Sequence, residues 1–330
     1  MSHWPVIGHD WAVEQLQQAV ARHELSHALL ITGPESVGKH TLALTLAKSL
    51  LCTAEAPERP CGVCSACRRV DSGNHLDLLL VDPEATGKGV KIDQIRALER
   101  FLSLTPNTGQ HKITIISSLE LMNSNAANAL LKTLEEPPSY AHLILLASDA
   151  DTLLPTIVSR SQHFPLRPLP GATIKAALVE HWGVAEAEAQ RLARLSGGRL
   201  GWAVQAITHP AHLRRAEESL QLLLDLLRSD LPTRFQTAQE LAGDTVNLAR
   251  SLEYWRTGWR DVLLLQTDNA AAITYLEHRE SLAEIAARVP LETTTAVLQS
   301  LSAAQKSLQR NANTRLLVET LLLELPEISQ

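Results

Sequence analysis

The sequence predicts an α/β domain built on a parallel sheet, followed by two regions made only of helices. Short, continuous apolar runs alternate with helical patterns up to about residue 165, as in a parallel sheet that is covered on both faces. Beyond that point, Leu residues recur at helical spacing. Aromatic residues make up only 4% of the 330 residues, which disfavours a large β-sandwich.

Four apolar runs are the predicted strands of the sheet. They cover residues 27–31, 76–81, 112–116 and 142–146. A helix is expected over 41–51, because its Leu residues fall on one face. Another is expected over 123–136, where Asn123 can cap the first turn and Pro137 cannot continue the last.

The prolines of residues 164–170 are predicted to break any regular element, so the first domain is expected to span 1–165. Short helices, interrupted at Gly197 and Gly198, predict a small helical lid domain over 166–208. Leu patterns further on predict an all-α domain over 209–330. The clearest of these patterns cover 220–227, 248–265 and 316–325.

Composition and charge exclude several functions. A net charge of −6 and a pI near 6.1 disfavour a free-standing nucleic-acid binder, so contact with DNA would be local or shared with partners. No apolar run reaches the ~18 residues of a membrane span, and the N-terminal region carries Asp10 and Glu14 instead of the basic start of a secretory signal. We expect a cytoplasmic protein with no membrane partner.

A glycine-rich motif follows the first predicted strand. Residues 33–40 read GPESVGKH and match G-x-x-x-x-G-K between a strand and a helix. Gly33 and Gly38 would let backbone N–H groups wrap a phosphate, and Lys39 would reach the outer phosphates. The next residue should carry the hydroxyl that binds Mg²⁺. It is His40, a poor ligand for this oxygen-seeking ion.

The second half of an ATPase site is also altered. An acidic pair is expected after the strand over 112–116, but Ser117 and Ser118 stand there and the first carboxylate is Glu120. We therefore expect neither ATP hydrolysis by this chain nor a Mg²⁺ site. Whether the loop still binds ATP is open, and an ordinary glycine turn is the alternative.

All four cysteines lie within one short segment. Cys52, Cys61, Cys64 and Cys67 have the spacing of four thiolate ligands around a tetrahedral Zn²⁺. Four protein ligands leave no open position, so the expected role is structural. An iron–sulfur cluster is the first alternative, and inert buried cysteines are the second.

Two further motifs carry a family resemblance. Residues 128–138 read NALLKTLEEPP, and residues 153–162 read LLPTIVSRSQ. With these strings and its cysteine cluster, the chain resembles bacterial clamp-loader subunits of the AAA+ class, which belong to DNA polymerase III. The second string resembles the Ser-Arg-Cys motif of the family, with Ser161 in place of Cys. The resemblance runs along the whole chain and is densest before residue 165.

The resemblance implies an AAA+ P-loop domain over 1–165 with a zinc module inserted at 52–67, a lid over 166–208 and an oligomerisation collar over 209–330. It implies a hetero-pentamer with motor subunits and a delta subunit, and a role in loading the sliding clamp onto primed DNA. It also implies that Arg160 serves as an arginine finger, reaching the ATP of a neighbouring subunit. A surface salt bridge is the alternative for Arg160.

Departures from the family pattern select among its members. Motor subunits carry Asp-Glu in place of Ser117 and Ser118, and Thr in place of His40. They also carry a sensor arginine at about Leu200, whereas this chain has Arg199 one place earlier. The differences favour the non-hydrolysing subunit, with any polymerase activity belonging to the assembly.

Two alternatives stay open. One is an ATP-hydrolysing motor subunit of the same family. The other is a zinc-dependent nucleic-acid-binding module, which the acidic balance and the lack of aromatic residues beside basic ones disfavour.

Overall fold

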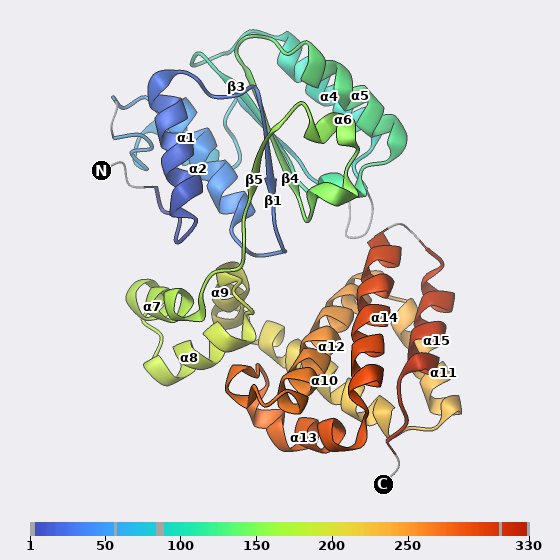
Figure 1. Cartoon of the computed structure of the whole chain (residues 1–330). Coiled ribbons are helices and arrows are strands. Elements are labelled where there is room, and N and C mark those ends of the chain that lie inside the picture. The colour runs from blue at the N-terminus through green and yellow to red at the C-terminus, as the bar shows by residue number, and fades with distance from the viewer. Residues whose placement is uncertain (1–3, 56–57, 84–88, 310–311, 329–330) are drawn as a thin grey trace. The chain divides into compact units, whose positions relative to one another are not determined.

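The computed structural model describes residues 4–55, 58–83, 89–309 and 312–328. The chain divides into two compact units, Met1–Ala203 and Val204–Gln330 (Figure 1). The three-domain division at residues 165 and 208 stays a prediction. No helix in the described ranges has the length and apolar character needed to cross a membrane.

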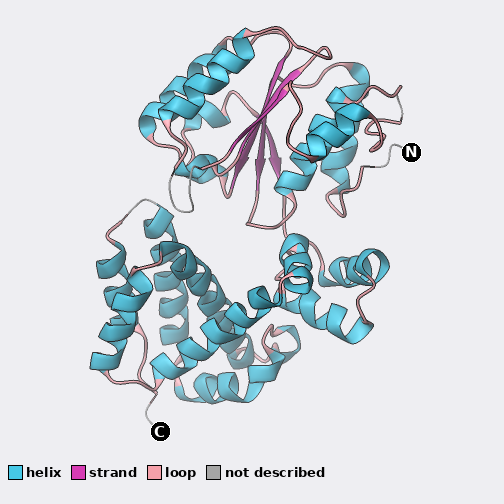
Figure 2. Ribbon diagram, turned by 180° about the vertical axis from the view of Figure 1, so that it is seen from behind, coloured by secondary structure: helices cyan, strands magenta, loops and turns pink. Residues whose placement is uncertain are grey.

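A parallel sheet is the centre of the first unit. Within the described residues its strands follow the order β2-β3-β4-β1-β5, and each neighbouring pair is parallel (Figure 2). The strands are β1 (Ala28–Thr32), β2 (Leu78–Val81), β3 (Lys112–Ile116), β4 (Ala141–Ala147) and β5 (Gln162–Pro165).

The four predicted strands are confirmed as β1 to β4, with shifted ends. The largest shift is in β2, which begins two residues later than predicted. Asp77 is fully buried there, and its carboxylate accepts hydrogen bonds from the backbone N–H groups of Asn107 and Thr108 at 2.7 and 2.9 Å. A loop is thus fastened to the start of the strand through a side chain.

The expectation that residues 164–170 break any regular element was wrong for the first two of them. Phe164 and Pro165 are the last residues of β5, which pairs only with β1 among the described strands. Proline is tolerated at the end of such an edge strand because no outer neighbour requires its missing N–H. Phe164 is 1% exposed and belongs to the core.

Helices cover both faces of the sheet (Figures 1 and 2). One face packs against α1 (Asp10–Arg22) and α2 (Lys39–Leu51), and the other against α4 (Ile92–Ser103), α5 (Ser124–Glu135) and α6 (Pro155–Val158). Alternate residues of each strand point to opposite faces. In β1, for example, Leu29 and Ile31 enter the first core, whereas Ala28 and Leu30 enter the second.

The sheet brings separate segments to one edge. Because the strands are parallel, the segments that follow β1, β3 and β4 all begin at their carboxyl ends, where α/β proteins bind ligands. The second segment contains the short helix η1 (Leu119–Leu121), and the third contains η2 (Ala150–Thr152). The short helix α3 (Ser65–Asp71) follows α2 and the cysteine-rich loop.

The predicted short helices lie at the end of the first unit. They are α7 (Gly171–Trp182), α8 (Glu186–Leu195) and the first part of α9 (Leu200–Thr208). The predicted interruption is confirmed, since Gly197 and Gly198 have φ of 58° and 88°. A Cβ on Gly198 would lie 2.8 Å from the carbonyl oxygen of Leu169, so this close approach requires glycine.

The second unit is helical throughout its described residues. Its elements are α10 (Pro210–Leu227), α11 (Leu231–Ala242), α12 (Thr245–Gln266), η3 (Ala270–Ala272), η4 (Leu276–His278), α13 (Arg279–Arg288), α14 (Leu291–Gln309) and α15 (Thr314–Glu324). Trp255 and Trp259 are almost fully buried in α12. Arg234 is also buried, and its guanidinium donates hydrogen bonds to the carbonyl oxygens of Leu226, Leu322 and Leu325. Arg234 thus joins the ends of α10 and α15.

Candidate functional site

The glycine-rich motif forms a loop between β1 and α2. Gly33 and Gly38 have φ of 147° and 118°, which favour glycine over residues with a Cβ. A Cβ on Gly33 would lie 2.5 Å from the carbonyl oxygen of Leu166. Ser36 has φ of 61°, and its carbonyl accepts a hydrogen bond of 2.9 Å from the N–H of Gly201. The start of α9 is therefore fastened to the loop.

Lys39 turns back onto its own loop. Its Nζ donates hydrogen bonds to the carbonyl oxygens of Gly33 and Pro34, the latter at 2.9 Å. Burial lowers the pKa of Lys39, and the nearby carboxylates of Glu120 and Glu35 oppose this effect. The amine that would contact phosphates is thus held by backbone carbonyls.

The residues that stand in place of the usual Mg²⁺ ligands lie where those ligands would be. His40 is exposed in the first turn of α2, and Ser117 and Ser118 follow β3. Arg199, one place before the expected sensor arginine, is buried, and its Nε donates a 2.9 Å hydrogen bond to the carbonyl oxygen of Ser196.

Glu120 is a site residue whose position sequence reasoning missed. Ser118 has φ of 52°, and the chain then turns into η1, so Glu120 returns to the edge of the sheet. Its Oε1 accepts a 3.2 Å hydrogen bond from the N–H of Ser148, just after β4. Its Oε2 is buried with no hydrogen-bond partner among the described residues. The signal in the sequence was the lone carboxylate after Ser118, but its spacing did not fit an acidic pair.

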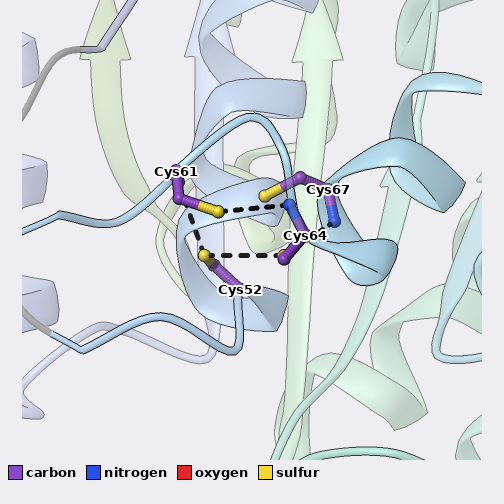
Figure 3. Close-up of side chains that lie close together, drawn as sticks. All are labelled: Cys52, Cys61, Cys64 and Cys67. Atoms are coloured by element: carbon purple, nitrogen blue, oxygen red, sulfur yellow. Dashed lines mark hydrogen bonds between the residues drawn. The ribbon is translucent and has the colours of Figure 1, made fainter.

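The four cysteines converge from the end of α2, the loop after it and the start of α3 (Figure 3). Their Sγ atoms all lie within 4.8 Å of one another, and none forms a disulfide. Backbone N–H groups point at three of the sulfurs. Cys61 donates to Cys52, Cys64 to Cys61 and Cys67 to Cys64, at 3.3–3.4 Å. Residues 56–57 of the predicted module lie outside the described residues.

The electrostatics of the cluster favour thiolates at two of its positions. Burial raises the pKa of Cys64, but backbone N–H groups of Cys67 and Thr53 lower it to about 5. Backbone N–H groups also lower the pKa of Cys61, whereas burial raises the pKa of Cys52 and of Cys67. Four convergent sulfurs fit the tetrahedral ligand set of a Zn²⁺ ion, which binds sulfur as thiolate.

The structure keeps the two sequence-predicted sites apart. Helix α2 begins at Lys39 and ends at Leu51, next to Cys52. At 1.5 Å per residue, its two ends are about 18 Å apart. The phosphate loop and the cysteine cluster therefore lie at opposite ends of one helix.

Arg160 follows α6 and extends into solvent. Its side chain is 37% exposed, and its Nη2 forms a 2.9 Å ion pair with Oε1 of Glu135. Its Nη1 donates a 3.1 Å hydrogen bond to the carbonyl oxygen of Thr156. Ser161, at the position of the family cysteine, donates from Oγ to the carbonyl oxygen of Ile157 at 2.9 Å. These contacts hold Arg160 against neighbouring residues of its own chain.

A phosphate loop at the carboxyl edge of this parallel sheet, with the start of α9 hydrogen-bonded to the loop, is typical of an α/β P-loop protein of the AAA+ class. The family model described as "DNA polymerase III, delta subunit" matches residues 8–170. Subunit delta' of DNA polymerase III from Bacillus subtilis is 32% identical over 94% of this chain and 94% of its own length. The chain belongs to the DNA polymerase III delta' family of clamp-loader subunits.

Two further relatives are also subunits of DNA polymerase III. Subunit delta' from Pseudomonas aeruginosa is 40% identical over 49% of each chain. Subunit tau of DNA polymerase III from Bacillus subtilis is 26% identical over 98% of this chain and 61% of its own length. The resemblance to clamp-loader subunits, inferred from the residues alone, is confirmed.

Proposed function

We propose that this chain is the non-hydrolysing subunit of a clamp loader in DNA replication, which anchors the hetero-pentamer that loads the sliding clamp onto primed DNA. The main support comes from the phosphate loop. The glycine conformations are retained, but Lys39 donates to loop carbonyls and His40 stands exposed where a hydroxyl should bind Mg²⁺. The loop therefore keeps the conformation of a phosphate loop but lacks a free lysine amine and a hydroxyl ligand for Mg²⁺, both of which hydrolysis requires.

Arg160 is proposed to act in trans, as an arginine finger for the ATP of a neighbouring motor subunit. Its guanidinium is exposed at the end of a short helix whose Ile157 is anchored in the core. A planar guanidinium can donate two parallel hydrogen bonds to a phosphoryl group. In well-studied systems such a residue accelerates phosphoryl transfer by about 10³–10⁵-fold.

A structural Zn²⁺ is proposed at the cysteine cluster. Cys52, Cys61, Cys64 and Cys67 would hold it, and the closed ligand set leaves no position for a substrate. The bound ion would fasten the loop between α2 and α3, a segment with little apolar core of its own.

The remaining proposals concern partners and location. Residues 166–208 are proposed as a lid and residues 209–330 as a collar that contacts the motor subunits and the delta subunit. Primed DNA and the sliding clamp would be met within this assembly, in the cytoplasm. The acidic net charge of −6 is consistent with a DNA contact that is shared among subunits.

A motor subunit is the second candidate. Two observations favour it. The glycine conformations of the loop are those of a phosphate loop, and the carboxylate of Glu120 is close enough to oppose the lowering of the pKa of Lys39 by burial. In that case the purified chain would hydrolyse ATP with Mg²⁺.

The test measures DNA-stimulated ATP hydrolysis by motor subunits assembled with this chain, as wild type and as Arg160→Ala. The chain alone serves as a control. We expect no hydrolysis by the chain alone and a large fall with Arg160→Ala. Hydrolysis by the chain alone would establish the motor subunit instead. An unchanged rate with Arg160→Ala would reduce the chain to a scaffold.

A further inference from the structure

Arg160 is held by the carboxylate of Glu135, a residue with no role in the proposed function. The ion pair with Glu135 joins the end of α5 to the turn after α6, at 2.9 Å between Nη2 and Oε1. The side chains are 37% and 51% exposed. An isolated ion pair of this exposure adds little to the stability of the fold. Its main effect is therefore on the orientation of the guanidinium.

The backbone positions of both partners are fixed by the same core. Leu134, next to Glu135, and Ile157, three residues before Arg160, are each 2% exposed and belong to one apolar cluster. The N–H of Arg160 also donates to the carbonyl oxygen of Ile157 at 3.2 Å. The distance between the two side chains is therefore set by the fold.

The helix ends explain why this pair is favourable for Arg160 in particular. Carbonyl groups give the carboxyl end of a helix a partial negative charge, which favours a cation and disfavours a carboxylate. Glu135 is the last residue of α5, so its own helix does not stabilise its charge. Arg160 supplies the missing positive charge to Glu135 and also donates to the carbonyl of Thr156 in α6.

These contacts leave donors for a phosphate. A guanidinium has five N–H groups. Within the described part of the chain, the acceptors of Arg160 are Oε1 of Glu135, the carbonyl of Thr156 and, at 3.5 Å, Oγ of Ser159. The hydrogen bonds to Thr156 and Ser159 both come from Nη1, and Nη2 forms the ion pair, so within the described residues the Nε–H has no acceptor and is available to a phosphate oxygen.

We propose that Glu135 is a positioning residue for Arg160, fixing the guanidinium in a set orientation before a neighbouring subunit's triphosphate reaches it. This inference rests on the proposed role of Arg160. A free arginine side chain samples many rotamers, and the entropy cost of ordering it during the reaction lowers the rate. Glu135 and Thr156 impose that order in advance, as preorganisation does in binding sites.

The test compares Glu135→Ala with Glu136→Ala in the assembled complex. Glu136 is the next residue, is exposed and forms no ion pair in the described ranges, so it controls for charge and helix end. We expect Glu135→Ala to lower kcat of DNA-stimulated hydrolysis by about two- to fivefold, the size of an exposed ion pair. KM for ATP should be unchanged, and Glu135→Gln, which keeps an acceptor, should fall between Glu135→Ala and wild type.

A double variant separates positioning from a structural effect. If Glu135 acts through Arg160, then Glu135→Ala together with Arg160→Ala should match Arg160→Ala alone. Thermal unfolding and co-elution with the motor subunits verify that each variant folds and assembles. A wild-type or raised rate for Glu135→Ala, or an added loss in the double variant, would overturn the inference. If Arg160→Ala itself has no effect, the proposed finger role fails, and this inference fails with it.

Discussion

At the scale of single residues, the cysteine cluster gives the most direct prediction. Cys64 accepts a backbone N–H and has a pKa of about 5, so it is a thiolate at neutral pH. Replacing it by Ser removes one of four ligands. We expect Cys64→Ser to lose the one Zn²⁺ per chain that wild type retains after dialysis, and to unfold at a lower temperature, because metal binding contributes to folding.

Metal content measured by atomic emission, with thermal unfolding alongside, checks this prediction. Ser65→Ala is the matched control, since Ser65 is exposed in the same turn. A brown protein that contains iron, or full zinc content in Cys64→Ser, would contradict the zinc proposal.

A pair formed by buried His142 and half-buried His111 predicts a dependence of stability on pH. The Nδ1–H of His142 donates to the carbonyl oxygen of Ser26, and its Nε2 accepts from Nδ1 of His111, each at 3.2 Å. Burial lowers the pKa of His142 from 6.5 to about 4, and the neighbouring His111 and His27 add to this effect. The folded state therefore favours neutral His142, while the unfolded state takes up a proton below pH 6.5.

The sign follows from proton binding. Between pH 6.5 and 4 the unfolded state binds more protons, so the free energy of unfolding should decrease as the pH falls through this window, by about 3 kcal/mol from His142. Urea unfolding at several pH values measures the slope. His142→Asn should show a shallower slope than wild type, whereas His40→Gln, at an exposed position, should keep it. Equal slopes in all three proteins would refute the assignment.

At the scale of elements, most strands and several helices of the first unit could be predicted from the sequence. Strands β1 to β4 were predictable because continuous apolar runs are typical of buried parallel strands. The helix over 124–135 was predictable from Asn123 and Pro137, and the structure confirms the cap, with Asn123 accepting from the N–H of Ala126 at 2.8 Å. Strand β5 was missed, because pairing with β1 overrides the local signal of Pro165.

The parts of the candidate site that lie within one short segment could be predicted from the sequence. The cysteine spacing and the glycine motif are local, so their geometry could be anticipated. The contacts of Glu120 with Ser148 and of Arg160 with Glu135 join residues far apart in the chain. Such contacts depend on the order of the strands, which the sequence does not display.

The cap of α5 yields a prediction at this scale. Removing the side-chain acceptor by Asn123→Ala leaves a backbone N–H of the first turn unpaired and should lower the free energy of unfolding by about 1 kcal/mol. Asn123→Ser retains an acceptor and should remain close to wild type. Denaturant titration of the three proteins measures the difference, and equal losses for Ala and Ser would show that the cap is not the cause.

At the scale of the whole molecule, the two compact units predict two unfolding transitions. Arg234 offers a change confined to the second unit. Arg234→Met would remove the guanidinium donor from the carbonyls of the buried residues Leu322 and Leu325, at a cost of about 3 kcal/mol or more. We expect one calorimetric transition to move down by about 10 °C while the other stays in place.

Arg228→Met is the matched control, because Arg228 is 43% exposed and forms a surface ion pair with Glu284. It should shift neither transition by more than a few degrees. A single transition in wild type, or equal shifts of both transitions in Arg234→Met, would show that the two units unfold together.

The order of the strands has a consequence for synthesis. Strand β1, which carries the phosphate loop, pairs with β4 and β5, and both leave the ribosome more than a hundred residues later. At about 5–20 residues per second, β1 waits roughly 6 to 23 s between its own emergence and that of residue 147, the end of β4. During that time β1, in which only Thr32 is polar, has no partner strand. The nascent first unit would therefore expose an apolar strand to holding chaperones until β4 is made.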